Sequence, residues 1–208
     1  MPCKDPNTLP ATAGTVERFV PGPKGEAEGL VLTDPAGRSR LVRFPPHLAR
    51  EVEALVRPGE FVAVRGDTEI EAGPIAAVAL TAADGRAVVD RGPKARGKPP
   101  EHERPAPRCR EDALVAGRVR LTLTAPKGEP HGAILEDGTV VRLGPKEAER
   151  FADLLRPGAR LAARGPAIGT AHGTVMEAEE LGPDPEGLRP ARPPKRRHDA
   201  AGPAAPSA

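Results

Sequence analysis

The sequence predicts a mainly-β fold of two small five-stranded barrels, each with one short helix between its third and fourth strands. Three observations lead to this expectation. The chain repeats itself, each copy contains short segments in which apolar and polar residues alternate, and the apolar spacing becomes helical once in each copy. A length of 208 residues is sufficient for two such domains.

The duplication is visible as strings that return at a fixed spacing. The segment PKGEAEG at 23–29 returns as PKGEPHG at 126–132, an offset of 103 residues. The segment LVRPG at 55–59 returns as LLRPG at 154–158, an offset of 99 residues. The second copy therefore lacks four residues, which we place at a hairpin tip near 33–40, where changes of length are tolerated.

The repeat and the composition together divide the chain. We expect a disordered N-terminus at 1–13, a first barrel at 14–90, a linker at 91–110, a second barrel at 111–182 and a disordered tail at 183–208. The linker contains seven Lys or Arg, two Glu and five Pro, and the tail contains seven Pro. Such segments have too few apolar residues to fold alone, although a general bias toward Ala, Gly, Pro and Arg codons would also enrich them.

The strands follow the same order in both copies. Each barrel begins with a strand that alternates in polarity, followed by a Pro/Gly-rich turn, a hairpin, the helix and two more strands. The expected strands are 14–20, 29–33, 40–44, 61–65 and one within 75–80 in the first copy, and 117–124, 132–136, 139–143, 160–164 and one within 174–181 in the second.

The helix is predicted from apolar residues spaced along one face. Leu48, Val52, Leu55 and Val56 form this stripe in the first copy, and Ala148, Phe151, Leu154 and Leu155 form it in the second. Each stripe begins after a proline and ends at a Pro-Gly pair. We expect each helix to cover one end of its barrel.

Three strands, a helix and two strands is the order of elements in an OB-fold barrel. The Pro-Lys-Gly-Glu turn, the proline before the helix and the Leu-x-x-Pro-Gly stretch before strand four also resemble short bacterial OB-fold proteins that are described only as nucleic-acid-binding-like or of unknown function. The resemblance covers both copies but neither the linker nor the ends of the chain. It implies a tandem duplication of OB-like barrels and makes oligonucleotide binding a reasonable expectation. It implies no catalytic residue.

Composition excludes several classes of protein. There is no Trp or Tyr, and aromatic residues make up 2% of the chain, so base-stacking platforms are few. No apolar run is long enough to span a membrane, and the N-terminus lacks the apolar stretch of a signal peptide, so we expect a cytoplasmic protein. Cys3 and Cys109 have no spacing typical of a metal site or a disulfide.

Motifs for catalysis are also missing from the sequence. There is no phosphate-binding loop, no His-Glu-x-x-His motif and no nucleophile elbow, and the two serines have no base beside them. The histidines at positions 131 and 172 have no counterpart in the first copy, although a shared metal site would be expected in both copies. We therefore expect no enzymatic activity, no metal and no cofactor.

Candidate binding residues lie where an OB-fold usually holds its ligand. They are the outward side chains of the first three strands, the lysines of the repeated turn and the basic residues of the tail. The set is Phe19, Lys24, Arg43, Arg118, Arg120, Lys127, Arg142, Arg192, Lys195, Arg196 and Arg197. Phe19 is the preferred stacking residue, and Phe61, which aligns with Arg160, is expected to be partly exposed. Alternatively, the arginines form an ordinary solvated surface, and the lysines belong to a simple turn with glycine at positive φ.

The distribution of charge leaves two hypotheses. The net charge is only +2, and the barrels are acidic, with −3 for 14–90 and −2 for 111–182. The linker carries +5, and residues 189–197 hold five basic residues and no acid. The first hypothesis is weak binding of single-stranded RNA or DNA, assisted by the basic segments. The alternative is an OB-fold module for a protein or small ligand; both leave the oligomeric state open and involve no membrane.

Overall fold

The first five-stranded barrel is formed by the N-terminal half of the chain. The computed structural model describes residues 8–69, 73–92, 110–125 and 127–192. The strands of the first sheet are β1 (Ala11–Pro21), β2 (Ala27–Thr33), β3 (Ser39–Arg43), β4 (Phe61–Asp67), β5 (Ile75–Ala82) and β6 (Ala87–Val89). They pair in the order β3-β2-β1-β4-β5-β6, and a parallel pairing of Val42 with Ile75 joins β3 to β5 and closes the barrel.

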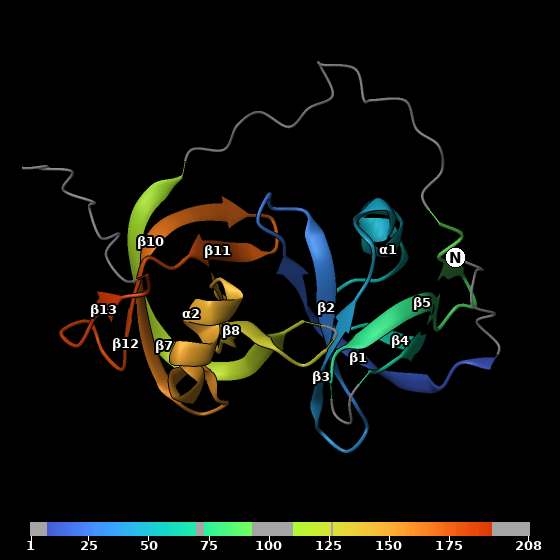
Figure 1. The fold of residues 1–208 in the computed structure, drawn as a ribbon. Coiled ribbons are helices and arrows are strands. Elements are labelled where there is room, and N and C mark those ends of the chain that lie inside the picture. The colour runs from blue at the N-terminus through green and yellow to red at the C-terminus, as the bar shows by residue number, and fades with distance from the viewer. Residues whose placement is uncertain (1–7, 70–72, 93–109, 126, 193–208) are drawn as a thin grey trace, which may run out of the picture.

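The second barrel repeats this topology. Its strands are β7 (Glu111–Thr124), β8 (Pro130–Leu135), β9 (Val140–Arg142), β10 (Arg160–Thr170), β11 (Gly173–Glu177), β12 (Glu180–Gly182) and β13 (Arg189–Pro190). The parallel pairing of Val140 with Val175 joins β9 to β11, which in turn pairs with β10. The expected fold class is therefore confirmed: the protein is mainly β, with two closed OB-like barrels side by side (Figure 1).

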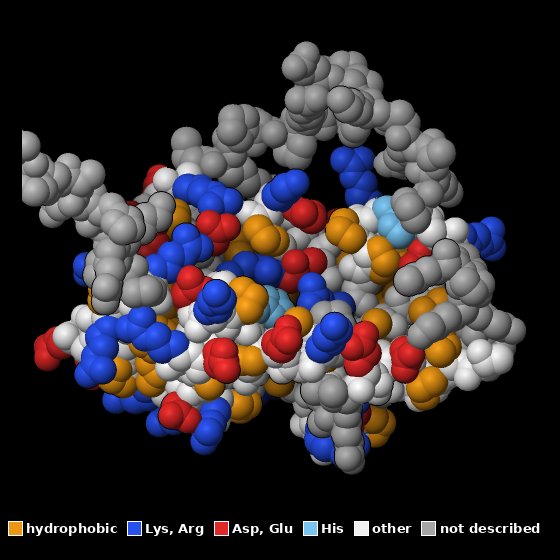
Figure 2. Space-filling view, viewed as in Figure 1, with side chains coloured by type: hydrophobic (Ala, Val, Ile, Leu, Met, Phe, Trp, Pro, Cys, Tyr) orange, Lys and Arg blue, Asp and Glu red, His pale blue; other side chains and the backbone are white. Residues whose placement is uncertain are grey.

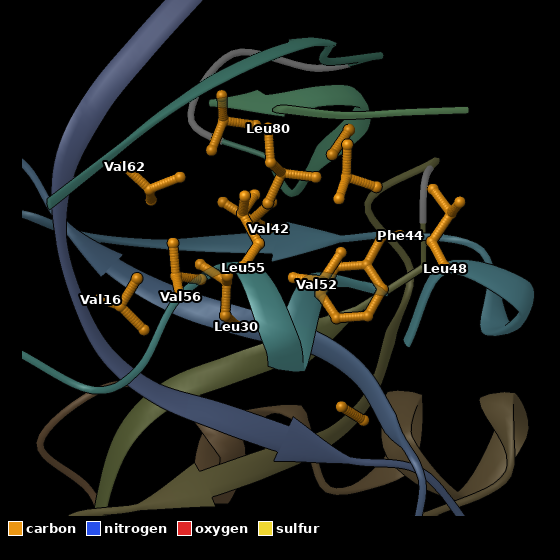
Figure 3. Packing of buried hydrophobic residues seen from close by; sticks show 14 of the residues in the cluster. Val16, Leu30, Val42, Phe44, Leu48, Val52, Leu55, Val56, Val62 and Leu80 are labelled. Atoms are coloured by element: carbon orange, nitrogen blue, oxygen red, sulfur yellow. The ribbon is translucent and has the colours of Figure 1, made fainter. Parts of the chain in front are cut away.

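Each barrel has its helix where the apolar stripe predicts it. A 3-10 turn (η2, Pro46–Leu48) and α1 (Ala49–Leu55) follow β3, while α2 (Pro145–Arg150) and a 3-10 turn (η4, Ala152–Leu155) follow β9. Val52 is completely buried and lies near Phe44 and Leu48 in the first core (Figure 3). In the second copy Phe151 is 9% exposed and belongs to the equivalent core.

The repeated Pro-Lys-Gly-Glu string forms the same turn in both barrels. Gly25 and Gly128 have φ angles of 85° and 88°, which favour glycine. The Gly25 N–H donates to Gly22 O and the Gly128 N–H to Ala125 O, both at 2.9 Å. The expected turn with glycine at positive φ is confirmed, while the binding role of its lysines stays a prediction.

The structure corrects the expectation for each end of the chain. Residues 11–13 are expected in the disordered N-terminus, but they belong to β1, and Ala11 pairs with Arg65 of β4. Residues 183–192 are expected in the disordered tail, but Leu181 of β12 pairs with Arg189 of β13. Ala191 is 1% exposed and packs into the second core. The many prolines around Ala191 are typical of a disordered segment, so the sequence does not predict this apolar contact. The rest of the expected tail and linker, 193–208 and 93–109, lies outside the described residues.

A β-bulge in the first strand of each barrel changes which side chains point outward. Pairing along β1 and β2 skips Glu17, and pairing along β7 and β8 skips Arg120, so each is the extra residue of a bulge. Strict alternation is lost beyond these residues. Phe19 therefore points inward and is 5% exposed, and the expectation that it lies on the outward face is wrong. Thr122 aligns with Phe19, and strict alternation predicts that it also points outward, but its hydroxyl donates to Leu155 O at 2.7 Å.

Candidate nucleic-acid interface

The surface on which OB-folds usually bind ligands is occupied here by the packing of one barrel against the other. A third apolar cluster contains outward residues of the first three strands of both barrels. It contains equivalent positions of the repeat, namely Val20 and Leu123, Val31 and Ile134, and Leu41 and Val140, and it is completed by Ile168 and Val175. The two copies thus present the same patch to each other, as the subunits of a two-fold symmetric dimer do. We call this contact the seam.

Polar contacts around the seam use three of the predicted binding arginines. Arg120 forms two hydrogen bonds with the Glu17 carboxylate, at 3.0 and 2.9 Å, and these bonds raise the pKa of its guanidinium above the usual value. Arg142 forms an ion pair with Glu28. Arg43 donates to Thr124 O at 3.4 Å. These side chains hold one barrel against the other instead of pointing to solvent as free cations.

His131 lies in the same group of side chains. Burial, together with the nearby positive charges of Arg43 and Arg142, lowers its pKa from 6.5 to about 4. Its Nδ1 atom is buried and has no hydrogen-bond partner among the described residues. The imidazole is therefore neutral near pH 7, which avoids a third positive charge beside the two arginines.

The turn between β10 and β11 reaches from the second barrel to the first (Figure 1). His172 lies in this turn, with its ring centroid 5.0 Å from that of Phe19. The His172 Nε2 atom is 2.8 Å from a carboxylate oxygen of Glu53, a residue of α1. Phe19 thus stabilises the contact between the barrels. No sequence pattern indicates this contact, because the first copy has no residue that matches His172.

The remaining predicted residues do not converge on one site. Lys24 and Lys127 are exposed in the repeated turns. Arg192 is exposed and lies 3.2 Å from Glu147 of α2. Lys195, Arg196 and Arg197 lie outside the described residues. On the face shown in Figure 2, the described basic and acidic side chains are interspersed and no continuous basic groove follows the seam.

One pair of arginines stays available on the outer side of β7 and β10. Arg118 and Arg160 lie directly opposite each other on these two strands. Arg118 donates to Gly158 O at 3.0 Å, and among the described residues neither guanidinium forms an ion pair with a carboxylate. Arg118, Arg160 and Asp184 line one shallow depression. The Asp184 carboxylate accepts the N–H of Gly187 at 2.7 Å.

The sequence pattern indicates Arg118 but not Arg160, because the alternation of polar and apolar residues along one strand does not show which distant strand pairs with it. The outward sides of equivalent strands in the two barrels each carry one of the two large apolar side chains that are exposed in the described part of the chain. Leu114, 47% exposed, lies opposite Arg164 on β7 and β10. Phe61, 48% exposed, lies opposite Thr15 on the equivalent strands of the first barrel.

Nothing in the described residues indicates a metal site, since they contain no group of three His, Cys, Asp or Glu side chains that could hold an ion. Within those residues there is also no helix long and apolar enough to cross a membrane.

Comparison with known proteins gives few matches. No protein-family model matches the chain, and no curated protein matches its sequence. Among solved structures, the chain is similar to the wild-type single-stranded DNA binding protein from Thermus aquaticus, at 18% identity over 95% of each chain and a TM-score of 0.24. A deletion mutant of that protein matches at 17% identity over 89% of this chain and 96% of that one, also with a TM-score of 0.24. Similarity at this level adds nothing to the barrel topology described above.

Proposed function

We propose that the protein is a non-enzymatic OB-fold pair that binds single-stranded nucleic acid on the outer surface of its second barrel. The observation that supports this most is the cross-strand pair of Arg118 and Arg160. Like charges directly opposite each other on two strands are destabilising. A phosphate group between the two guanidinium groups would offset that repulsion, and arginine suits phosphate geometry.

The basic segments on either side of the second barrel support the same proposal. Arg110, where the linker ends, forms an ion pair with Glu177 at 2.8 Å, and Arg192 forms one with Glu147 at 3.2 Å. Glu177 and Glu147 line a second depression, which is distinct from that of Arg118 and Arg160. Arg110 and Arg192, the described residues that border the two most basic segments, thus both bind the second barrel, and we infer that these segments add sequence-independent attraction for phosphates there.

The test is fluorescence anisotropy with a labelled single-stranded homopolymer at several salt concentrations. The variant is Arg118→Ala with Arg160→Ala. The matched control, Arg38→Ala with Arg86→Ala, removes the same charge from two exposed arginines that pair with Asp34 and Asp84 in their own turns. We expect the first variant to lose affinity and to lower the salt slope by about 1.4, or roughly 0.7 for each contact, while the control keeps the wild-type slope.

Two outcomes contradict the proposal. Full-length protein that shows no binding even at low salt rules out nucleic acid as the ligand, and the interaction-module alternative then replaces it. Equal losses in the variant and its control show that only net charge matters, so the arginine pair is not the site.

A further inference from the structure

Phe61 occupies an unusual position for a phenylalanine in this protein. It begins β4 and points outward. Val62 and Val64, which point inward from the same strand, are completely buried. The other three phenylalanines are at most 9% exposed, and the chain has no Trp or Tyr. Phe61 is thus the only exposed phenylalanine among the described residues.

The position of Phe61 in the first barrel is that of Arg160 in the second. Phe61 lies opposite Thr15 on β4 and β1, and Arg160 lies opposite Arg118 on β10 and β7. At the same place on their outer surfaces, one barrel therefore offers an aromatic ring and the other offers two positive charges.

These two places are connected by a row of outward side chains that crosses the seam. Residues two apart on a strand share a side, so Thr15 is followed by Glu17, and Arg118 by Arg120. Glu17 and Arg120 bind each other at 2.9 Å. In order, the row is Phe61, Thr15, Glu17, Arg120, Arg118 and Arg160.

We propose that a single strand held by its phosphates at Arg118 and Arg160 crosses the seam and stacks a base on Phe61. This inference rests on the proposed function and extends it to the first barrel. A flat ring and a pair of guanidinium groups suit alternating bases and phosphates, since base stacking on aromatic rings is tolerant of sequence.

The substitution Phe61→Trp gives a direct readout, because it places the sole tryptophan of the chain at the proposed contact. We expect a homopolymer of about 16 nucleotides to quench the tryptophan fluorescence of this variant. We expect Phe61→Ala to weaken binding of the same strand roughly five- to hundredfold without a change in the salt slope. The control is Phe61→Leu, which keeps an apolar side chain at the same position but removes the aromatic ring.

The outcomes separate this inference from the proposed function. If the strand binds through Arg118 and Arg160 but neither quenches Phe61→Trp nor depends on Phe61, the stacking inference is wrong and the proposed function stands. Wild-type affinity of Phe61→Leu also overturns it, because an apolar side chain without a ring is then sufficient. Quenching by polyglutamate as strong as by the nucleic acid shows that the row binds an acidic protein instead. If wild-type protein binds no strand at low salt, both proposals fail.

Discussion

Glu17 and Arg120 are the same residue position of the two repeats, and they bind each other. Each is the extra residue of a β-bulge, and the bulge directs its side chain toward the opposite barrel. In a pair of identical copies, two equal charges would meet at this point. The opposite charges therefore favour the pairing of copy one with copy two over the pairing of either copy with itself.

The first prediction concerns this ion pair. Arg120→Glu should loosen the seam, because two carboxylates then face each other, and Glu17→Arg in the same chain should restore it. The side chains of Arg120 and Glu17 are 42% and 21% exposed, so solvent screens the pair, and we expect a coupling free energy of about 1 kcal/mol. A double-mutant cycle of thermal unfolding measures it, and additive effects of the two substitutions would contradict the contact.

The second prediction is that cutting the linker does not separate the barrels. A protease site within 93–109 yields two fragments, which should elute together in size-exclusion chromatography because the apolar cluster of the seam remains buried between them. Ile134→Asp should release them, since it puts an unpaired charge into that cluster. If the cut Ile134→Asp protein still elutes at the size of the uncut protein, contacts outside this apolar cluster hold the two barrels together.

The third prediction concerns the barrel cores. Val52→Asp and Phe151→Asp should each unfold their own barrel, at a cost of at least about 3 kcal/mol, because each places a charge beneath the helix. Circular dichroism follows the loss, and Glu51→Asp on the exposed side of α1 is the control. A melting curve like that of the wild type for either core variant would contradict this assignment.

The fourth prediction is a dependence of stability on pH. The folded protein keeps His131 neutral down to about pH 4, whereas the unfolded chain takes up the proton near pH 6.5. Between these values the unfolded state binds more protons, so the free energy of unfolding falls as the pH drops. His131→Gln should reduce this slope, and equal slopes in the variant and the wild type would show that His131 does not contribute.

The fifth prediction concerns the basic end of the chain. Deleting residues 193–208 should weaken binding of single strands and lower its salt dependence, because Lys195, Arg196 and Arg197 are lost. It should not change any base preference, since phosphate contacts carry no sequence information. Anisotropy with different homopolymers checks both points, and a changed preference would indicate that this segment contacts bases.

The sequence was sufficient to predict the two barrels, but not which face of each barrel packs against the other. Repeat, alternation and the helical stripe are local or periodic signals, and they located the strands, the turns at Gly25 and Gly128 and the buried Val52. A bulge adds one residue without a clear local signature, so Phe19 was placed on the wrong side. The seam depends on pairs such as Glu17 and Arg120, which are 103 residues apart, and two acceptable surface charges in one sequence do not indicate that they meet.

The seam also has a consequence for synthesis of the protein. The first barrel can close on its own strands as soon as β5 has been made, but Val20, Val31 and Leu41 have no partner until the second barrel exists. A ribosome adds about 5–20 residues per second, so this apolar patch stays uncovered for several seconds. During that interval the same patch of a second nascent chain could cover it. The Glu17 carboxylates of the two chains would then face each other and repel. The carboxylate that later joins the barrels thus first discourages aggregation between unfinished chains.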